Sequence, residues 1–132
     1  MTRNPLGRLE GVLIVGIGGF AGSNLRYFVE SLVPSTLAAT ATVNVLGCLA
    51  LGFFFYERRF GDRLTERGRT VLATGFISSF TTYSTFVLDA LTAVPAVGLA
   101  YLAGSYALGF VGVLAGRELA RAVTRRLDGV SE

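Results

Sequence analysis

Histidine, lysine and tryptophan are absent from this 132-residue chain, and Cys48 is its only cysteine. One cysteine cannot form a disulfide within the chain. Without histidine, and with a single thiol, most transition-metal sites and catalytic triads are excluded. We therefore expect a protein that is not an enzyme.

Charged residues are also scarce, at 16% of the chain, whereas 52% of the residues are hydrophobic. This balance differs strongly from that of a soluble domain. A hydrocarbon core about 30 Å thick requires roughly 20 apolar residues per helix, so the chain has room for four membrane spans and little else. The net charge of +3 comes from arginines in the tails and one loop, so we expect no nucleic-acid partner.

Four apolar stretches, separated by turn residues and charge, predict an all-α membrane protein with four transmembrane helices. We place these spans near 9–29, 36–56, 70–91 and 95–116, within a single four-helix domain that covers residues 1–132. No small-residue cleavage pattern follows the N-terminal residues. The first span is therefore predicted to be retained rather than removed as a signal peptide.

The arginines predict the orientation of the chain. Eleven of the twelve lie before the first span, between the second and third, or after the fourth, and therefore on one side of the membrane. They are Arg3, Arg8, Arg58, Arg59, Arg63, Arg67, Arg69, Arg117, Arg121, Arg125 and Arg126. Because positively charged flanks stay inside, we expect a multi-pass protein of the plasma membrane with both termini in the cytoplasm.

Two polar side chains lie at membrane depth, where such residues are costly and suggest function. Arg26, near the outer end of the first span, either anchors the helix at the interface or pairs with Glu30. Asn44 lies in the middle of the second span, where its amide requires a partner or water. An interhelical hydrogen bond that only holds helices together explains Asn44 equally well.

The stretch GFISSFTTYSTF, residues 75–86, carries six serine and threonine side chains within eight positions. They make an uninterrupted lipid-facing helix unfavourable, and they predict a break near the middle of the third span that lines a polar cavity and frees carbonyls for a cation. Tyr83 and Phe86 are three residues apart and share a helix face, and aromatic ring edges can face an anion. Aromatic packing between helices is the alternative.

Three segments together resemble the CrcB/Fluc family of fluoride channels: GGFAGSNLRY at 18–27, TATVNVLGCLALG at 40–52 and GFISSFTTYSTF at 75–86. They occur in family order and, with the four spans, cover essentially the whole membrane portion. The resemblance implies a fluoride-specific channel subunit that exports cytoplasmic fluoride passively and relieves fluoride toxicity. It also implies an inverted, antiparallel dimer with two pores and a structural sodium ion at its centre.

The resemblance also assigns roles to residues. The backbone carbonyls of Ser78 and Thr81 are the implied sodium ligands, Arg26 is the vestibule arginine, and Asp89 matches a vestibule acid or is a plain helix-end charge. The pore is implied to use an amide that donates to fluoride, two aromatics whose edges contact it and two hydroxyls of a polar track, with Thr82 and Ser84 as further contributors. These pore residues are Asn44, Tyr83, Phe86, Tyr101 and Ser105.

Two features depart from the family pattern. Ser78 and Ser79 replace the usual glycine pair at the break, and Tyr83 replaces the first pore phenylalanine, so its hydroxyl can make the two pores unequal. The arginine bias fixes one orientation, whereas dual-topology homodimers need nearly balanced charge. We therefore expect a heterodimer with an oppositely oriented homologue.

Two other classes of protein share four short spans. A small multidrug-type transporter requires an acid within the first span, but Glu10 and Glu30 lie too near its two ends, and no tryptophan is available for a cation pocket. A non-transporting membrane assembly subunit explains the glycine-rich spans but leaves the serial hydroxyls unexplained. The fluoride channel is therefore the leading hypothesis.

Overall fold

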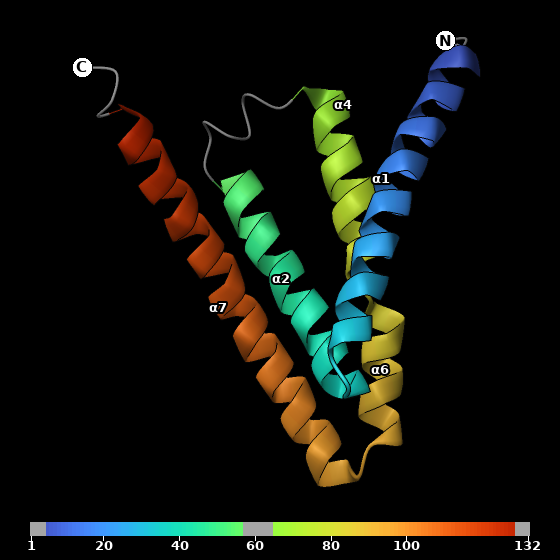
Figure 1. Cartoon of the computed structure of the whole chain (residues 1–132), viewed down its shortest axis with the longest axis vertical. Helices are drawn as coiled ribbons and strands as arrows, with labels where there is room; N and C mark the ends of the chain where they lie inside the picture. Colours follow the sequence, from blue (N-terminus) through green and yellow to red (C-terminus); the bar gives the residue numbers. More distant parts are fainter. Residues whose placement is uncertain (1–4, 57–64, 129–132) are drawn as a thin grey trace.

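The computed structural model describes residues 5–56 and 65–128, and every regular element in them is helical (Figure 1). The long helices are α1 (Pro5–Leu32), α2 (Thr36–Tyr56) and α7 (Pro95–Asp128). Between α2 and α7 the chain forms α4 (Glu66–Arg69), the π-helix η1 (Thr70–Ile77), α5 (Ser78–Phe80) and α6 (Tyr83–Thr92). Of the arginines used above for topology, Arg3, Arg58, Arg59 and Arg63 lie outside the described residues.

Four stretches of the described residues are long and apolar enough to cross a bilayer: Leu9–Leu32, Thr36–Phe55, Arg67–Thr92 and Pro95–Arg126. The prediction of an all-helical, multi-pass membrane protein is therefore confirmed. The helix ends differ from the expected spans. α1 begins at Pro5, because proline is tolerated in the first helical turn. α7 continues past residue 116 to Asp128, because the arginine, leucine and alanine residues there favour helix.

Two residues within the third span are not helical. Thr81 has φ −81° and ψ 162°, and Thr82 has φ −145° and ψ 121°, so both are extended between the end of α5 and the start of α6. The Thr82 hydroxyl accepts a hydrogen bond from the Thr85 backbone N–H at 3.3 Å and thereby caps α6. The interruption therefore ends in an ordered helix start.

The helices pack mainly in pairs, α2 with α7 and α1 with η1 and α5 (Figure 1). Glycines allow the backbones to approach closely, because a Cβ atom at Gly52 would meet the Val113 carbonyl and one at Gly116 the Leu49 carbonyl. Gly18 and Gly22 approach the η1 backbone in the same way. A Cβ atom at Gly104, in contrast, would have open space around it.

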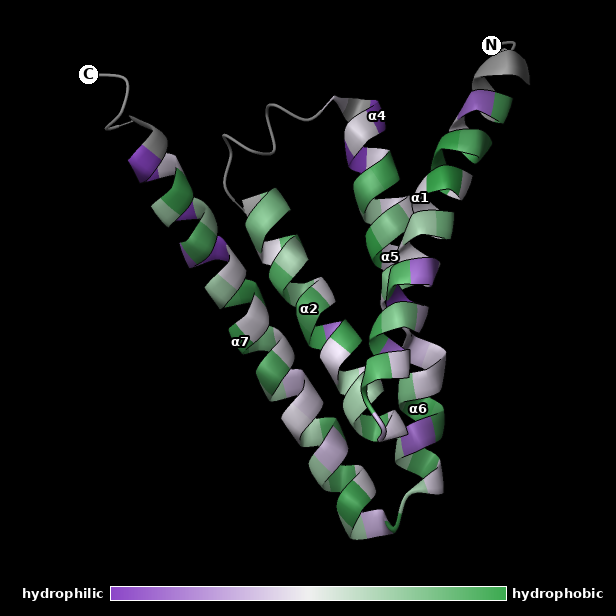
Figure 2. Ribbon diagram, viewed as in Figure 1, coloured by the Kyte–Doolittle hydropathy of each residue, from purple (hydrophilic) through white to green (hydrophobic). Residues whose placement is uncertain are grey.

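The beginnings of α1 and α4 and the ends of α2 and α7 lie at one end of the molecule (Figure 1). Hydrophilic residues gather on α4 and on the last turns of α7, whereas the middle of each span is largely hydrophobic (Figure 2). Large apolar side chains there are exposed on the single chain, including Ile17 (69%), Phe20 (73%) and Phe110 (71%). Lipid or another chain must cover this surface.

Candidate functional site

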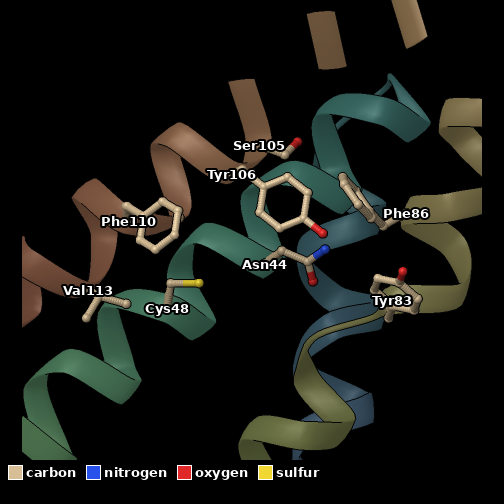
Figure 3. Close-up of a pocket in the computed structure, with 9 residues that line it drawn as sticks. Asn44, Cys48, Tyr83, Phe86, Ser105, Tyr106, Phe110 and Val113 are labelled. Carbon is tan, nitrogen blue, oxygen red and sulfur yellow. The ribbon is translucent and has the colours of Figure 1, made fainter. Parts of the chain in front are cut away.

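One cavity of about 340 Å³ brings together four of the predicted pore residues (Figure 3). Asn44 comes from α2, Tyr83 and Phe86 from α6, and Ser105 from α7. The remaining lining residues are Cys48, Tyr106, Gly109, Phe110 and Val113. Residues that lie far apart in the sequence therefore meet at one place between three helices.

The packing of α2 against α7 shapes one wall of this cavity. Cys48 lies one helical turn after Asn44 and faces Gly109, where a Cβ atom would lie 3.4 Å from the Cys48 Sγ. A side chain larger than alanine at position 109 would therefore press on Cys48 and reduce the cavity. The opposite wall is α6, whose first turn carries Tyr83 directly after the interruption.

Asn44 forms two hydrogen bonds with the backbone of a single residue. Its Oδ1 accepts from the Thr82 N–H at 2.8 Å, and its Nδ2 donates to the Thr82 carbonyl at 3.0 Å. Both polar groups of an extended residue inside the span are thus satisfied. An amide nitrogen carries two hydrogens, so the second Nδ2 hydrogen can still be donated to another acceptor, and Figure 3 shows the amide directed at the cavity.

Phe86 is the aromatic centre of the site. It is 6% exposed, and its ring centroid lies 6.2 Å from that of Tyr83, 5.2 Å from Tyr101 and 5.9 Å from Tyr106. The Tyr106 ring meets Phe86 nearly perpendicularly, at 86°. Tyr83 is 73% exposed, so it forms the open side of the cavity. Phe86 thus both packs between helices and borders the cavity, and the two interpretations of this residue are compatible.

Tyr101 is not among the residues that line the cavity, although it contacts Phe86. Its hydroxyl is buried and has no hydrogen-bond partner within residues 5–56 and 65–128. Asp89 is 8% exposed, and its Oδ2 accepts a hydrogen bond from the Thr40 hydroxyl at 2.8 Å. Asp89 is therefore a buried carboxylate, not a solvated charge at a helix end. Of the further contributors, Thr82 is buried and Ser84 is exposed.

Ser78 and Thr81, the predicted sodium ligands, lie at the interruption of the third span. In a continuous α-helix their carbonyls would accept from the N–H groups of Thr82 and Thr85, four residues later. The Thr82 N–H donates to Asn44 instead, and the Thr85 N–H donates to the Thr82 hydroxyl. Both carbonyls therefore lose their expected helical donors. The described part of the chain contains no cluster of three or more histidine, cysteine or acidic side chains suited to a metal.

Arg26 lies in a different pocket, of about 350 Å³. Its Nε is 3.7 Å from a carboxylate oxygen of Glu30, one helical turn later, which is the pairing considered from the sequence. The structure thus separates the predicted vestibule residue from the four residues of the main cavity.

Tyr106 and Phe110 were missed by the sequence reasoning. The resemblance points to Tyr101 and Ser105, which are four residues apart, but Tyr106 follows Ser105 directly and lines the same cavity. The cavity residues of α7 are 105, 106, 109, 110 and 113, a spacing typical of a single helix face around the small Gly109. This spacing in the sequence could have indicated Tyr106 and Phe110.

These features define a multi-pass membrane protein with a small cavity lined by an amide and aromatic rings between its helices. Residues 13–117 match the family described as CrcB-like protein, Camphor Resistance (CrcB), and the chain belongs to this family.

Similar proteins include one from Haloarcula marismortui named fluoride-specific ion channel FluC 1, which is 50% identical over 118 residues, or 89% of this chain and 91% of that protein. A protein of the same name from Natronomonas pharaonis is 42% identical over 83% of this chain and 93% of its own length. The protein from Halobacterium salinarum named fluoride-specific ion channel FluC 2 is 43% identical over 81% of this chain and 84% of its own length.

Proposed function

We propose that this chain is a subunit of a fluoride-specific channel that lets cytoplasmic fluoride leave the cell passively and so relieves fluoride toxicity. The observation that carries the proposal is the meeting of Asn44, Tyr83, Phe86 and Ser105 at one cavity, in a chain that belongs to the CrcB-like family. The names of the similar proteins agree with this function.

The cavity has the chemistry that passage of a small anion requires. Fluoride is strongly hydrated, so donors must replace water, yet they must bind weakly enough for release. The second Nδ2 hydrogen of Asn44 and the Ser105 hydroxyl are such donors. The ring edges of Phe86 and Tyr83 add positive electrostatic potential without full charge. A site without a full positive charge favours passage over tight binding.

A structural sodium ion at the interruption is part of the proposal. The carbonyls of Ser78 and Thr81 would hold it, because their usual helical donors bond elsewhere and carbonyl oxygens are suitable ligands for a hard cation. The ion would satisfy these carbonyls and hold the interruption in place when bound. Asn44 fixes Thr82 beside Thr81 through the chain's own hydrogen bonds.

The proposed assembly is an antiparallel dimer with an oppositely oriented homologue. The exposed Tyr83 and the apolar faces of the spans provide surface that a partner would cover. Eleven of twelve arginines flank one side, which opposes insertion of the same chain in both orientations. The names FluC 1 and FluC 2 among the similar proteins agree with more than one such chain in an organism.

In this assembly the chain lies in the plasma membrane with both termini in the cytoplasm. The ends of α1, α2, α4 and α7 that border the arginine-rich segments lie together at one end of the molecule, which supports this orientation (Figure 1). The multidrug-transporter alternative gains no support, because Glu10 pairs with Arg67 near the start of α1 and Glu30 pairs with Arg26 near its end.

Fluoride efflux from proteoliposomes tests this function. Vesicles loaded with fluoride should release little through this chain alone and should release it rapidly when the chain is co-reconstituted with an oppositely biased homologue. Chloride release from the same vesicles should stay at the background level. Absence of fluoride release in both preparations would contradict the channel function, whereas full release by the single chain would contradict only the heterodimer.

A further inference from the structure

The pocket that contains Arg26 is distinct from the proposed fluoride cavity and has its own charge pattern. Its volume is about 350 Å³, and it is formed by the end of α1, the turn at 33–35, the start of α2 and the first turn of α6. Arg26 and Glu30 are the only charged residues among its lining side chains within the described chain. Thr36, Thr40 and Thr85 add hydroxyl groups.

Arg26 and Glu30 form an incomplete ion pair. The closest atoms, the Arg26 Nε and a Glu30 carboxylate oxygen, are 3.7 Å apart, and the side chains are 32% and 35% exposed. A guanidinium group carries five N–H donors in a planar fork, so a single long contact leaves most of them for an anion. The chain itself therefore leaves part of both charges uncovered on the pocket side.

Hydrogen bonds connect this pocket to the proposed fluoride cavity. Thr85 lines the pocket, and its hydroxyl lies 3.0 Å from the hydroxyl of Thr82. Thr82 is bonded through both backbone groups to Asn44, which lines the cavity. Thr40 also lines the pocket and donates to the buried Asp89. The pocket is therefore linked to the fluoride site through Thr85, Thr82 and Asn44. It lies where α1 ends and α2 begins, away from the arginine-rich end of the molecule (Figure 1).

We infer that Glu30 sets the fluoride affinity of the channel by acting as the counter-charge of Arg26. This inference rests on the proposed function and deepens it. The Glu30 carboxylate neutralises the positive charge that attracts anions to the pocket, and it repels fluoride directly. Removal of its charge leaves Arg26 as the dominant charge of this pocket. The channel then fills at lower fluoride concentration, while the cavity and its maximal rate stay unchanged.

The experiment measures initial fluoride efflux over a range of fluoride concentrations, with the chain reconstituted together with its homologue. Glu30→Gln should lower the half-saturating fluoride concentration roughly two- to fivefold, the factor that corresponds to the strength of a partly exposed charge pair. Maximal efflux should not change. Added impermeant salt should reduce the difference, because it screens exposed charges.

Two further variants make the result specific. Glu10→Gln removes the same charge from the same helix, but Glu10 pairs with Arg67 at 3.1 Å at the opposite end, so the half-saturating concentration should match that of the wild type. Arg26→Gln should raise the half-saturating concentration, which is a readout that still applies if Glu30→Gln fails to assemble.

An assembled Glu30→Gln channel with the wild-type half-saturating concentration would overturn the inference, as would an equal shift in Glu10→Gln. An assembled Arg26→Gln channel that is unchanged would overturn it as well. Failure of the proposed function is a different result, because the wild-type pair would then release no fluoride at any concentration.

Discussion

Asn44 has a structural role that its position alone did not reveal. Its amide bonds both backbone groups of Thr82, so it supports the interruption of the third span from a neighbouring helix. The sequence allowed either a pore donor or an interhelical hydrogen bond for this residue. One amide can do both, because one Nδ2 hydrogen holds Thr82 and the other is available to the cavity.

Replacement of Asn44 by leucine should abolish fluoride flux and lower stability. Two backbone groups inside the span lose their partners, which costs about 1–3 kcal/mol each when a buried group stays unsatisfied. Efflux assays and thermal unfolding in detergent measure the two effects. Asn24→Leu is the matched control, because the Asn24 amide is exposed and bonds only the Phe20 carbonyl of its own helix. Normal flux in Asn44→Leu would exclude a pore role for this amide.

Phe86 should be essential for conduction but not for assembly. Phe86→Ile removes the ring edge that borders the cavity while keeping an apolar side chain among Tyr83, Tyr101 and Tyr106. We expect flux to fall to background while the dimer fraction in size-exclusion chromatography is unchanged. Phe20→Ile, at a ring that is 73% exposed on α1, should conduct normally. Loss of the dimer in Phe86→Ile would instead assign this ring a packing role only.

At the scale of elements, glycines on the same helix differ in their function. Gly116→Ala places a Cβ atom against the Leu49 carbonyl and should separate α2 from α7, at a cost of about 1–3 kcal/mol. Gly104→Ala, on the same helix, meets no atom within 4 Å and should stabilise α7 by about 0.5–1 kcal/mol through helix propensity. Thermal unfolding monitored by circular dichroism measures whether each replacement lowers or raises the stability of the protein. A destabilised Gly104→Ala or an unaffected Gly116→Ala would contradict this packing.

The spans were predictable because hydrophobic length is a strong signal, and α2 begins and ends where the apolar stretch does. The extension of α7 to Asp128 was not predictable from hydropathy, because helix propensity in a polar segment carries no membrane signal. The hydroxyl-rich stretch predicted irregular backbone, and the extended residues are Thr81 and Thr82. The hydrogen bonds from Asn44 to Thr82 depend on how two helices meet, which no local pattern encodes.

The site was predictable in part for a similar reason. Asn44 was noticeable because polar residues at membrane depth are rare, and Tyr83 and Phe86 because they belong to the hydroxyl-rich stretch. Ser105 was assigned only through the resemblance to the family. Tyr106 was missed because a tyrosine in an apolar helix does not show which way it faces until the neighbouring helix is placed. Cys48 was noticed only as a cysteine, and its position in the cavity follows from the close packing of α2 on α7.

At the scale of the whole molecule, the single chain leaves the cavity and much apolar surface uncovered. The cavity is bordered on one side by Tyr83, which is 73% exposed, and large apolar residues are exposed along every span. A monomer would present these groups to lipid, which cannot satisfy the polar atoms of the cavity. The distribution of arginines then decides which kind of partner can complete it, because an inverted dimer of one chain requires that chain in both orientations.

We expect the chain to insert in one orientation only. Single cysteines at exposed positions, Ser35→Cys between α1 and α2 and Thr65→Cys before α4, can be introduced into a Cys48→Ser background. A membrane-impermeant maleimide should label Ser35→Cys in intact cells, and it should label Thr65→Cys only after permeabilisation. Similar labelling of both positions in intact cells would indicate dual topology and remove the argument for a heterodimer.

Replacement of Arg117, Arg121, Arg125 and Arg126 by glutamine should weaken the orientation bias, because charges that flank the spans set the orientation. Partial labelling of Thr65→Cys in intact cells should then appear, which would tie the choice of partner to the arginines themselves.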